Sequence, residues 1–131
     1  MVKIWLTGTV CFFLAFNANA ACPSIEGEWA ITFDEVWYGY QLAGIGRATV
    51  TADKIKLRLR EGQLGTSYIT TFSGKYAVQA NCMLTWNYAE QGGASAGTVH
   101  GIIVSANKLF LMFSNPGVQS TGSMLAERIE Y

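Results

Sequence analysis

Over most of the chain, apolar and polar residues alternate with a period of two, the pattern of β-strands that bury one face. The clearest example is 55–60, in which Leu57 and Leu59 share one face while Lys56 and Arg58 share the other. Runs of this kind, or runs rich in Thr and aromatic residues, cover 27–33, 55–60, 67–73, 75–80, 82–89, 97–104, 108–114 and 122–131. No stretch keeps a helical apolar stripe over several turns. We therefore predict an all-β protein.

The predicted strands are joined by short connections with turn-forming residues, such as Ala80-Asn81 and Asn115-Pro116-Gly117. About eight short strands connected in this way form a meander of antiparallel hairpins, which packs as a sandwich or closes into a barrel. Closure is favoured because it removes exposed edges, along which such apolar strands would pair with other chains. Glycines inside strands, such as Gly74 and Gly101, fit the bends of a small barrel. We predict a small antiparallel up-and-down β-barrel.

The first twenty residues have a different pattern. One basic residue, Lys3, precedes an apolar run at 10–16, and the segment ends Ala18-Asn19-Ala20. Small residues at the first and third positions before the cleavage site are typical of a secretory signal peptide. The apolar run is shorter than the roughly 20 residues of a transmembrane helix. We expect a signal peptide at 1–20, removed after Ala20, and one barrel domain at 21–131 that is periplasmic or extracellular and has no integral membrane span.

Composition narrows the class of partner. The 131-residue chain is 50% hydrophobic and 14% charged, and nine basic side chains balance nine acidic ones. A nucleic-acid-binding protein usually carries a basic excess on one face, so we expect no nucleic-acid partner. Part of the low charged content, compared with about 25% in typical domains, comes from the expected signal peptide.

Cysteine positions add a candidate disulfide. Cleavage would remove Cys11 and leave Cys22 and Cys82. An even number of cysteines in an exported chain favours a disulfide, because these compartments are oxidising; two unrelated buried thiols are the alternative. With one histidine and no Cys-x-x-Cys motif, the chain lacks a usual zinc ligand set. We predict no metal site and no cofactor.

Two sets of residues carry a resemblance to known families. The Gly27-Glu28-Trp29 strand together with Arg128 resembles the lipocalin and calycin pattern, which implies that Arg128 stacks on Trp29 and caps the closed end of a barrel. The segments 72–82 and 115–128 resemble small exported bacterial proteins with a calycin-like barrel related to allene oxide cyclase, although Asn81 stands where those proteins usually have Asp. That family has no assigned activity, and none of the cyclase's substrate-site residues can be matched.

Candidate catalytic groups are few. His100, the only histidine, lies in a predicted strand, where a structural or exposed role is favoured. Asp34 and Glu35 are adjacent, so on a strand they would point to opposite faces, and a solvated turn is the favoured interpretation. The Gly-rich segment 90–97 lacks the Gly-Lys-Ser/Thr sequence that ends a phosphate-binding loop. We expect it to form a hairpin loop, which would lie beside the mouth of the barrel if the barrel has one. We predict no catalytic residue and favour a protein that is not an enzyme.

Aromatic residues give the most suggestive cluster. Trp37, Tyr38 and Tyr40 follow the first predicted strand, and Trp86 and Tyr88 lie on a later one. These five residues are candidate contacts for a ligand at the mouth of the barrel. Because a small barrel has room for side chains or one small ligand, we expect a filled interior slightly more than a pocket. The aromatic residues of 37–40 alternate across both faces, so some must be exposed, at a portal, a partner surface or a dimer contact.

Two functions therefore remain open. The first is an exported calycin-like barrel that binds a small apolar ligand. The second is a non-catalytic structural or interaction protein of the cell envelope, with a filled core, that binds another envelope protein or itself as a homodimer. A void of roughly 300 Å³ or more with aromatic walls would favour the first.

Overall fold

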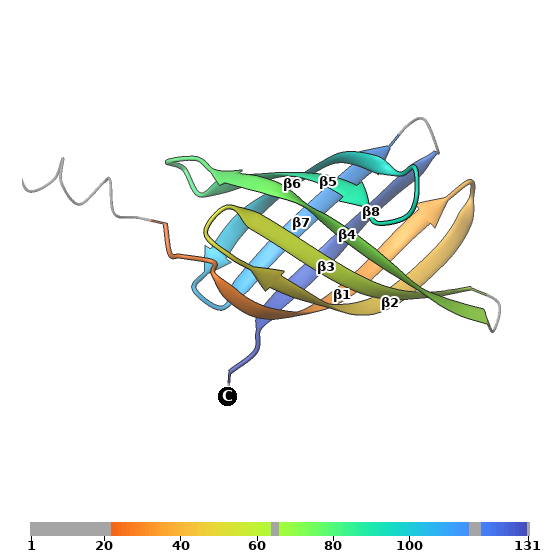
Figure 1. The fold of residues 1–131 in the computed structure, drawn as a ribbon, viewed down its shortest axis with the longest axis horizontal. Coiled ribbons are helices and arrows are strands. Elements are labelled where there is room, and N and C mark those ends of the chain that lie inside the picture. Colours follow the sequence, from red (N-terminus) through yellow and green to blue (C-terminus); the bar gives the residue numbers. More distant parts are fainter. Residues whose placement is uncertain (1–21, 64–65, 116–118, 131) are drawn as a thin grey trace, which may run out of the picture.

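The protein is described here by a computed structural model that covers residues 22–63, 66–115 and 119–130. In these residues the chain forms a closed barrel in which each strand pairs antiparallel with the next and the last returns to the first (Figure 1). The strands are β1 (Gly27–Trp37), β2 (Tyr40–Val50), β3 (Lys54–Gln63), β4 (Thr66–Val78), β5 (Met83–Glu90), β6 (Ala96–Ser105), β7 (Lys108–Asn115) and β8 (Ser120–Arg128). The prediction of an all-β, up-and-down barrel is confirmed. The expected signal peptide at 1–20 and residues 116 and 117 of the last predicted turn lie outside the described residues.

Two of the differences from the predicted strands involve glycines. Residues 40–50, which form β2, were not among the predicted strand runs, although Gly44 and Gly46 were expected to lie inside strands. A Cβ at Gly44 would lie 2.6 Å from the carbonyl oxygen of Arg60, so glycine there permits close approach to β3. The strand β4 was predicted as two strands, but it continues through Gly74, where a Cβ would overlap the carbonyl oxygen of Asn87. These glycines fit tightly paired strands instead of ending them.

Alternation divides each strand between the barrel interior and the outer wall. On β1, Trp29, Ile31 and Phe33 are buried, whereas Ala30 and Thr32 between them are exposed. The same pattern on the other strands produces a continuous apolar core inside the barrel. Its buried members are Ile25, Trp29, Ile31, Phe33, Ala48, Val50, Ile55, Leu57, Leu59, Leu84, Trp86, Val99, Ile103, Leu109, Leu111, Met124 and Ala126.

One end of the barrel is closed by the segment that precedes β1. Arg128 lies over Trp29, with its Cζ 4.5 Å from the ring centroid, and the Trp29 Nε1 donates a hydrogen bond to the Ile25 carbonyl. The Arg128 guanidinium also donates hydrogen bonds to the carbonyl oxygens of Ser24 and Glu26, and to that of Ala106. Charge-assisted bonds of this kind hold the segment across the barrel end.

The predicted disulfide between Cys22 and Cys82 is confirmed, and it joins the same segment to the connection between β4 and β5. Because β1 begins at this closed end, the opposite end contains the β1–β2 and β5–β6 hairpins. We call this opposite end the open end.

Candidate functional site

A cavity of about 270 Å³ occupies the open end of the barrel, and side chains from all eight strands line it. The closed half is packed with aliphatic residues and Trp29, so the interior changes from filled to hollow along the barrel axis. The expectation that side chains would fill the interior is therefore wrong for the open half. The reason lies in where the large side chains are placed.

Glycines at inward-facing positions leave room for aromatic rings to lie against the barrel wall. A Cβ added at Gly97 would lie 2.8 Å from the hydroxyl of Tyr88, so this ring occupies the space above the glycine instead of the middle of the cavity. Two further pairs repeat the arrangement, with 2.9 Å and 2.6 Å between the added Cβ and the ring: Gly44 with Phe33, and Gly122 with Phe113. Aromatic cover over strand glycines is a known device of β-structure, and here it keeps the centre of the open half free.

The rings in the wall support one another. Tyr88 is 5.4 Å from Phe72 in an edge-to-face arrangement and 5.5 Å from Trp86, measured between ring centroids. The Trp86 Nε1 donates a hydrogen bond to the Gly74 carbonyl at 3.1 Å. Aromatic pairs in these geometries are favourable beyond the area that they bury. The wall is therefore preorganised, with apolar ring surface facing the cavity.

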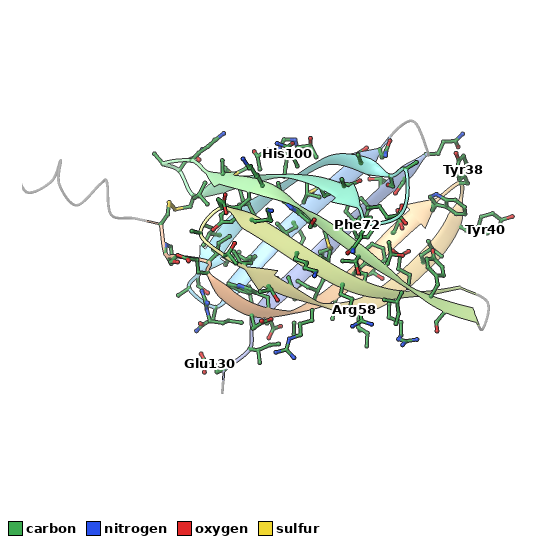
Figure 2. The ribbon with its side chains drawn as sticks, in the orientation of Figure 1. Tyr38, Tyr40, Arg58, Phe72, His100 and Glu130 are labelled. Carbon is green, nitrogen blue, oxygen red and sulfur yellow. A yellow bond between two sulfur atoms is a disulfide. The ribbon has the colours of Figure 1, made fainter. Side chains whose placement is uncertain are left out.

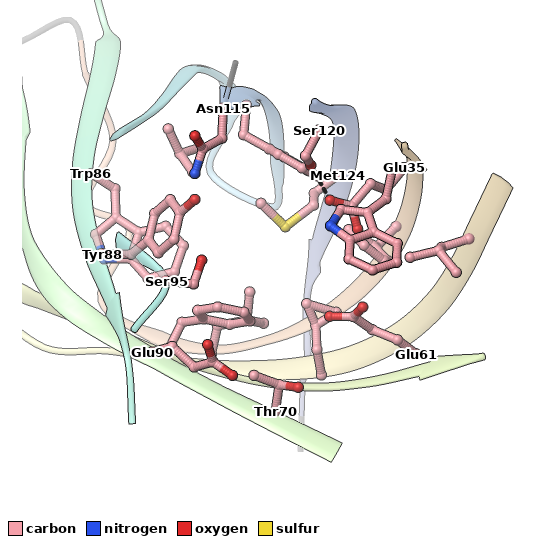
Figure 3. A pocket seen from close by; sticks show the side chains of 18 of the residues that line it. Glu35, Glu61, Thr70, Trp86, Tyr88, Glu90, Ser95, Asn115, Ser120 and Met124 are labelled. Carbon is pink, nitrogen blue, oxygen red and sulfur yellow. Dashed lines mark hydrogen bonds between the residues drawn. The ribbon is translucent and has the colours of Figure 1, made fainter. Parts of the chain in front are cut away.

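Three carboxylates also face the cavity: Glu35 on β1, Glu61 on β3 and Glu90 at the end of β5 (Figure 3). Glu61 is only 7% exposed and accepts a hydrogen bond from the Tyr68 hydroxyl at 3.0 Å. Glu35 accepts a hydrogen bond from the Ser120 hydroxyl. Within the described chain, the residues that line the cavity include no Lys, Arg or His.

Burial and like charge act together on these acids. Burial raises the pKa of both Glu35 and Glu61, and the charges of Glu35 and Glu90 raise the pKa of Glu61 further. Burial and the bond to Glu61 raise the pKa of Tyr68 to about 12. The Tyr68 phenol consequently stays protonated at neutral pH and remains a hydrogen-bond donor to Glu61.

The five aromatic residues that the sequence singled out divide into two groups. Trp37, Trp86 and Tyr88 line the cavity. Tyr38 and Tyr40 lie at the outer tip of the β1–β2 hairpin, 45% and 55% exposed, and do not line it (Figure 2). His100 lies on the outer wall, also exposed (Figure 2).

The carboxylates were missed as site residues, and Glu35 was wrongly placed in a solvated turn. The strand β1 continues to Trp37, so its alternation places Glu35 inside and the neighbouring Asp34 outside. On β3, Glu61 lies two residues after Leu59 and four after Leu57, so it points into the barrel as they do. Extending the period of two past the last apolar residue of each strand would have identified these positions.

The described residues contain no group of three or more His, Cys, Asp or Glu side chains arranged to hold a metal ion. Within the same part of the chain, no helix is long and apolar enough to cross a membrane.

Comparison with known proteins identifies the fold but no family. No family model matches the chain, and no curated protein matches it. The chain is similar to a solved structure described as a redesigned β-barrel, with a TM-score of 0.61 and 12% sequence identity, over 84% of this chain and 98% of that one. The similarity supports the small closed barrel and nothing finer.

Proposed function

We propose that this protein binds a small, largely apolar ligand in the cavity at the open end of the barrel. The observation that carries the proposal is a cavity of about 270 Å³ with aromatic walls at one end of a barrel whose other half is packed. Ligand pockets in proteins usually begin at about 300 Å³ and are lined by apolar and aromatic side chains. The cavity is slightly smaller than this lower limit of about 300 Å³, which was also the criterion set from the sequence, so it suits only a compact ligand, such as one bicyclic aromatic ring system with a short substituent.

The proposal includes export, in keeping with the calycin-like resemblance of the sequence. The features that support it are the signal-peptide pattern at 1–20 and the disulfide between Cys22 and Cys82, a bond typical of oxidising compartments. Binding would need no catalytic residue, so the proposal is for a binding protein and not for an enzyme.

The test is to block the cavity with a side chain. Thr70 lines the cavity, and its neighbour Thr71 lies on the opposite face of β4. We expect Thr70→Phe to abolish binding of 2-naphthylmethanol, a neutral compound of suitable size, as measured by isothermal titration calorimetry. Thr71→Phe is the matched control and should bind as the unchanged protein does. Equal binding by both variants, or no binding by the unchanged protein of either 2-naphthylmethanol or its amine analogue 2-naphthylmethylamine, would refute the proposal.

An interaction surface is the second candidate, because apolar side chains also line up on the outer wall. Met83, Ile102 and Phe110 face solvent on three adjacent strands and are paired in register. Exposed apolar patches often mark contacts with a partner protein or a second copy of the chain. Sedimentation velocity would separate the two candidates, since Phe110→Asp should dissociate a homodimer and leave cavity binding unchanged.

A further inference from the structure

Among the described residues that line the cavity, no side chain provides a cationic partner for the interior carboxylates. Glu35, Glu61 and Glu90 come from three strands and face one space (Figure 3), and the described residues that line it carry no positive charge. Taking a carboxylate out of water is costly unless a positive charge or several hydrogen bonds compensate for it. The hydroxyls of Tyr68 and Ser120 each donate one such bond, to Glu61 and Glu35 respectively. They orient the carboxylates and add no positive charge.

Mutual repulsion makes the arrangement more costly. The charges of Glu35 and Glu90 act on Glu61, which is the most buried of the three. A barrel that needed only a filled core would be more stable with apolar residues at these positions, because like charges that are partly buried repel one another. Their placement around a cavity large enough for a small molecule indicates that a ligand supplies the missing positive charge.

The cavity walls fit the remainder of such a ligand. The rings of Phe72, Trp86 and Tyr88 form one connected aromatic group in the cavity wall. Aromatic faces attract cations, and they also bury apolar surface. An ammonium group has three N–H donors, and ionised carboxylates are acceptors only, so the two complement each other.

We propose that the cavity binds an organic amine in its protonated form, with the ammonium group at Glu35, Glu61 and Glu90 and an apolar body against the aromatic wall. This inference rests on the proposed binding function and specifies the chemical class of its ligand. Tyr68 and Ser120 are positioning residues, because they act on the ligand through the carboxylates that they hold.

A matched series of three probes tests the inference. 2-Naphthylmethylamine, 2-naphthylmethanol and 2-naphthoate have the same ring system and carry a positive, zero and negative charge. We expect the amine to bind at least about tenfold more tightly than the alcohol, since hydrogen bonds to charged groups contribute about 1.5–3 kcal/mol and 1.4 kcal/mol is tenfold in affinity. The carboxylate should bind least. If the alcohol binds as tightly as the amine, the inference is overturned and the proposed function stands. If none of the three binds, both are refuted.

Substitutions of the carboxylates test whether these groups produce the preference for the amine. Glu35→Gln and Glu61→Gln should each reduce the ratio of amine to alcohol affinity at least about threefold, with little change for the alcohol, because each removes one charge from the cavity. Asp34→Asn is the matched control, since Asp34 adjoins Glu35 and points to the outer wall. Circular dichroism identifies any variant that fails to fold, and Glu90→Gln then replaces it. An unchanged ratio in folded variants would overturn the assignment.

Discussion

Removing the disulfide should destabilise the protein mainly by increasing the conformational entropy of the unfolded chain. Cys22 and Cys82 are 60 residues apart in sequence, so the bond closes a long loop that contains all of β1, β2, β3 and β4. The loop-closure model gives an entropy of about 14 cal/mol/K for a loop of that length, which is about 4 kcal/mol at 25 °C. In the folded state, the hydrogen bonds from Arg128 and Trp29 still hold the segment 24–26 at the closed end. We therefore expect Cys22→Ser/Cys82→Ser to fold and to lose about 4 kcal/mol of stability.

Urea denaturation followed by tryptophan fluorescence measures this loss. Trp29 and Trp86 are both fully buried, so their emission reports the unfolding of each half of the barrel. The m-value should rise, because the unfolded chain without the cross-link exposes more surface. Binding of 2-naphthylmethanol should be unchanged under folding conditions, since the cavity lies at the other end. A loss below about 1 kcal/mol with an unchanged m-value would refute the loop-closure reasoning.

Two further predictions concern stability. Because the pKa of Glu61 is raised by folding, the folded protein holds this proton at pH values where the unfolded chain has already released it. The protein therefore loses stability as the pH rises from the ordinary pKa of a glutamate through the raised pKa of Glu61. Glu61→Gln should therefore melt at a higher temperature than the unchanged protein at pH 7 and at the same temperature near pH 3; an equal difference at both pH values would contradict this. At the β1–β2 hairpin, Tyr38 and Gly39 both have positive φ, of 47° and 81°. Because Asn tolerates this conformation better than Tyr, Tyr38→Asn should add roughly 1 kcal/mol to the free energy of unfolding, whereas an unchanged or lower denaturation midpoint would argue against strain at this turn.

The candidate site could be predicted only in part, and the acidic residues show why. Asp34 and Glu35 resemble a turn when they are judged by polarity alone. In the barrel they continue β1, and the hydrogen bonds to β2 and β8 extend the strand past its last aliphatic core residue. Local polarity gave the wrong answer because pairing on both sides stabilises the strand there. The aromatic residues were easier to find, since Trp86 and Tyr88 share the inward parity of their strand.

The pattern of residues along the chain was sufficient for the class of fold and the approximate number of strands, and it favoured the disulfide partners once Cys11 was assigned to the expected signal peptide. These properties depend on the alternation of apolar and polar residues, on turn residues and on the number of cysteines, and each of these can be read from the sequence without knowing which distant residues are in contact. The cavity was decided by tertiary structure alone. It depends on which glycine lies beneath which ring, as with Gly97 and Tyr88, and on three acids from distant segments meeting inside one closed sheet. Such contacts join residues far apart in sequence, and only the register of the closed barrel determines them.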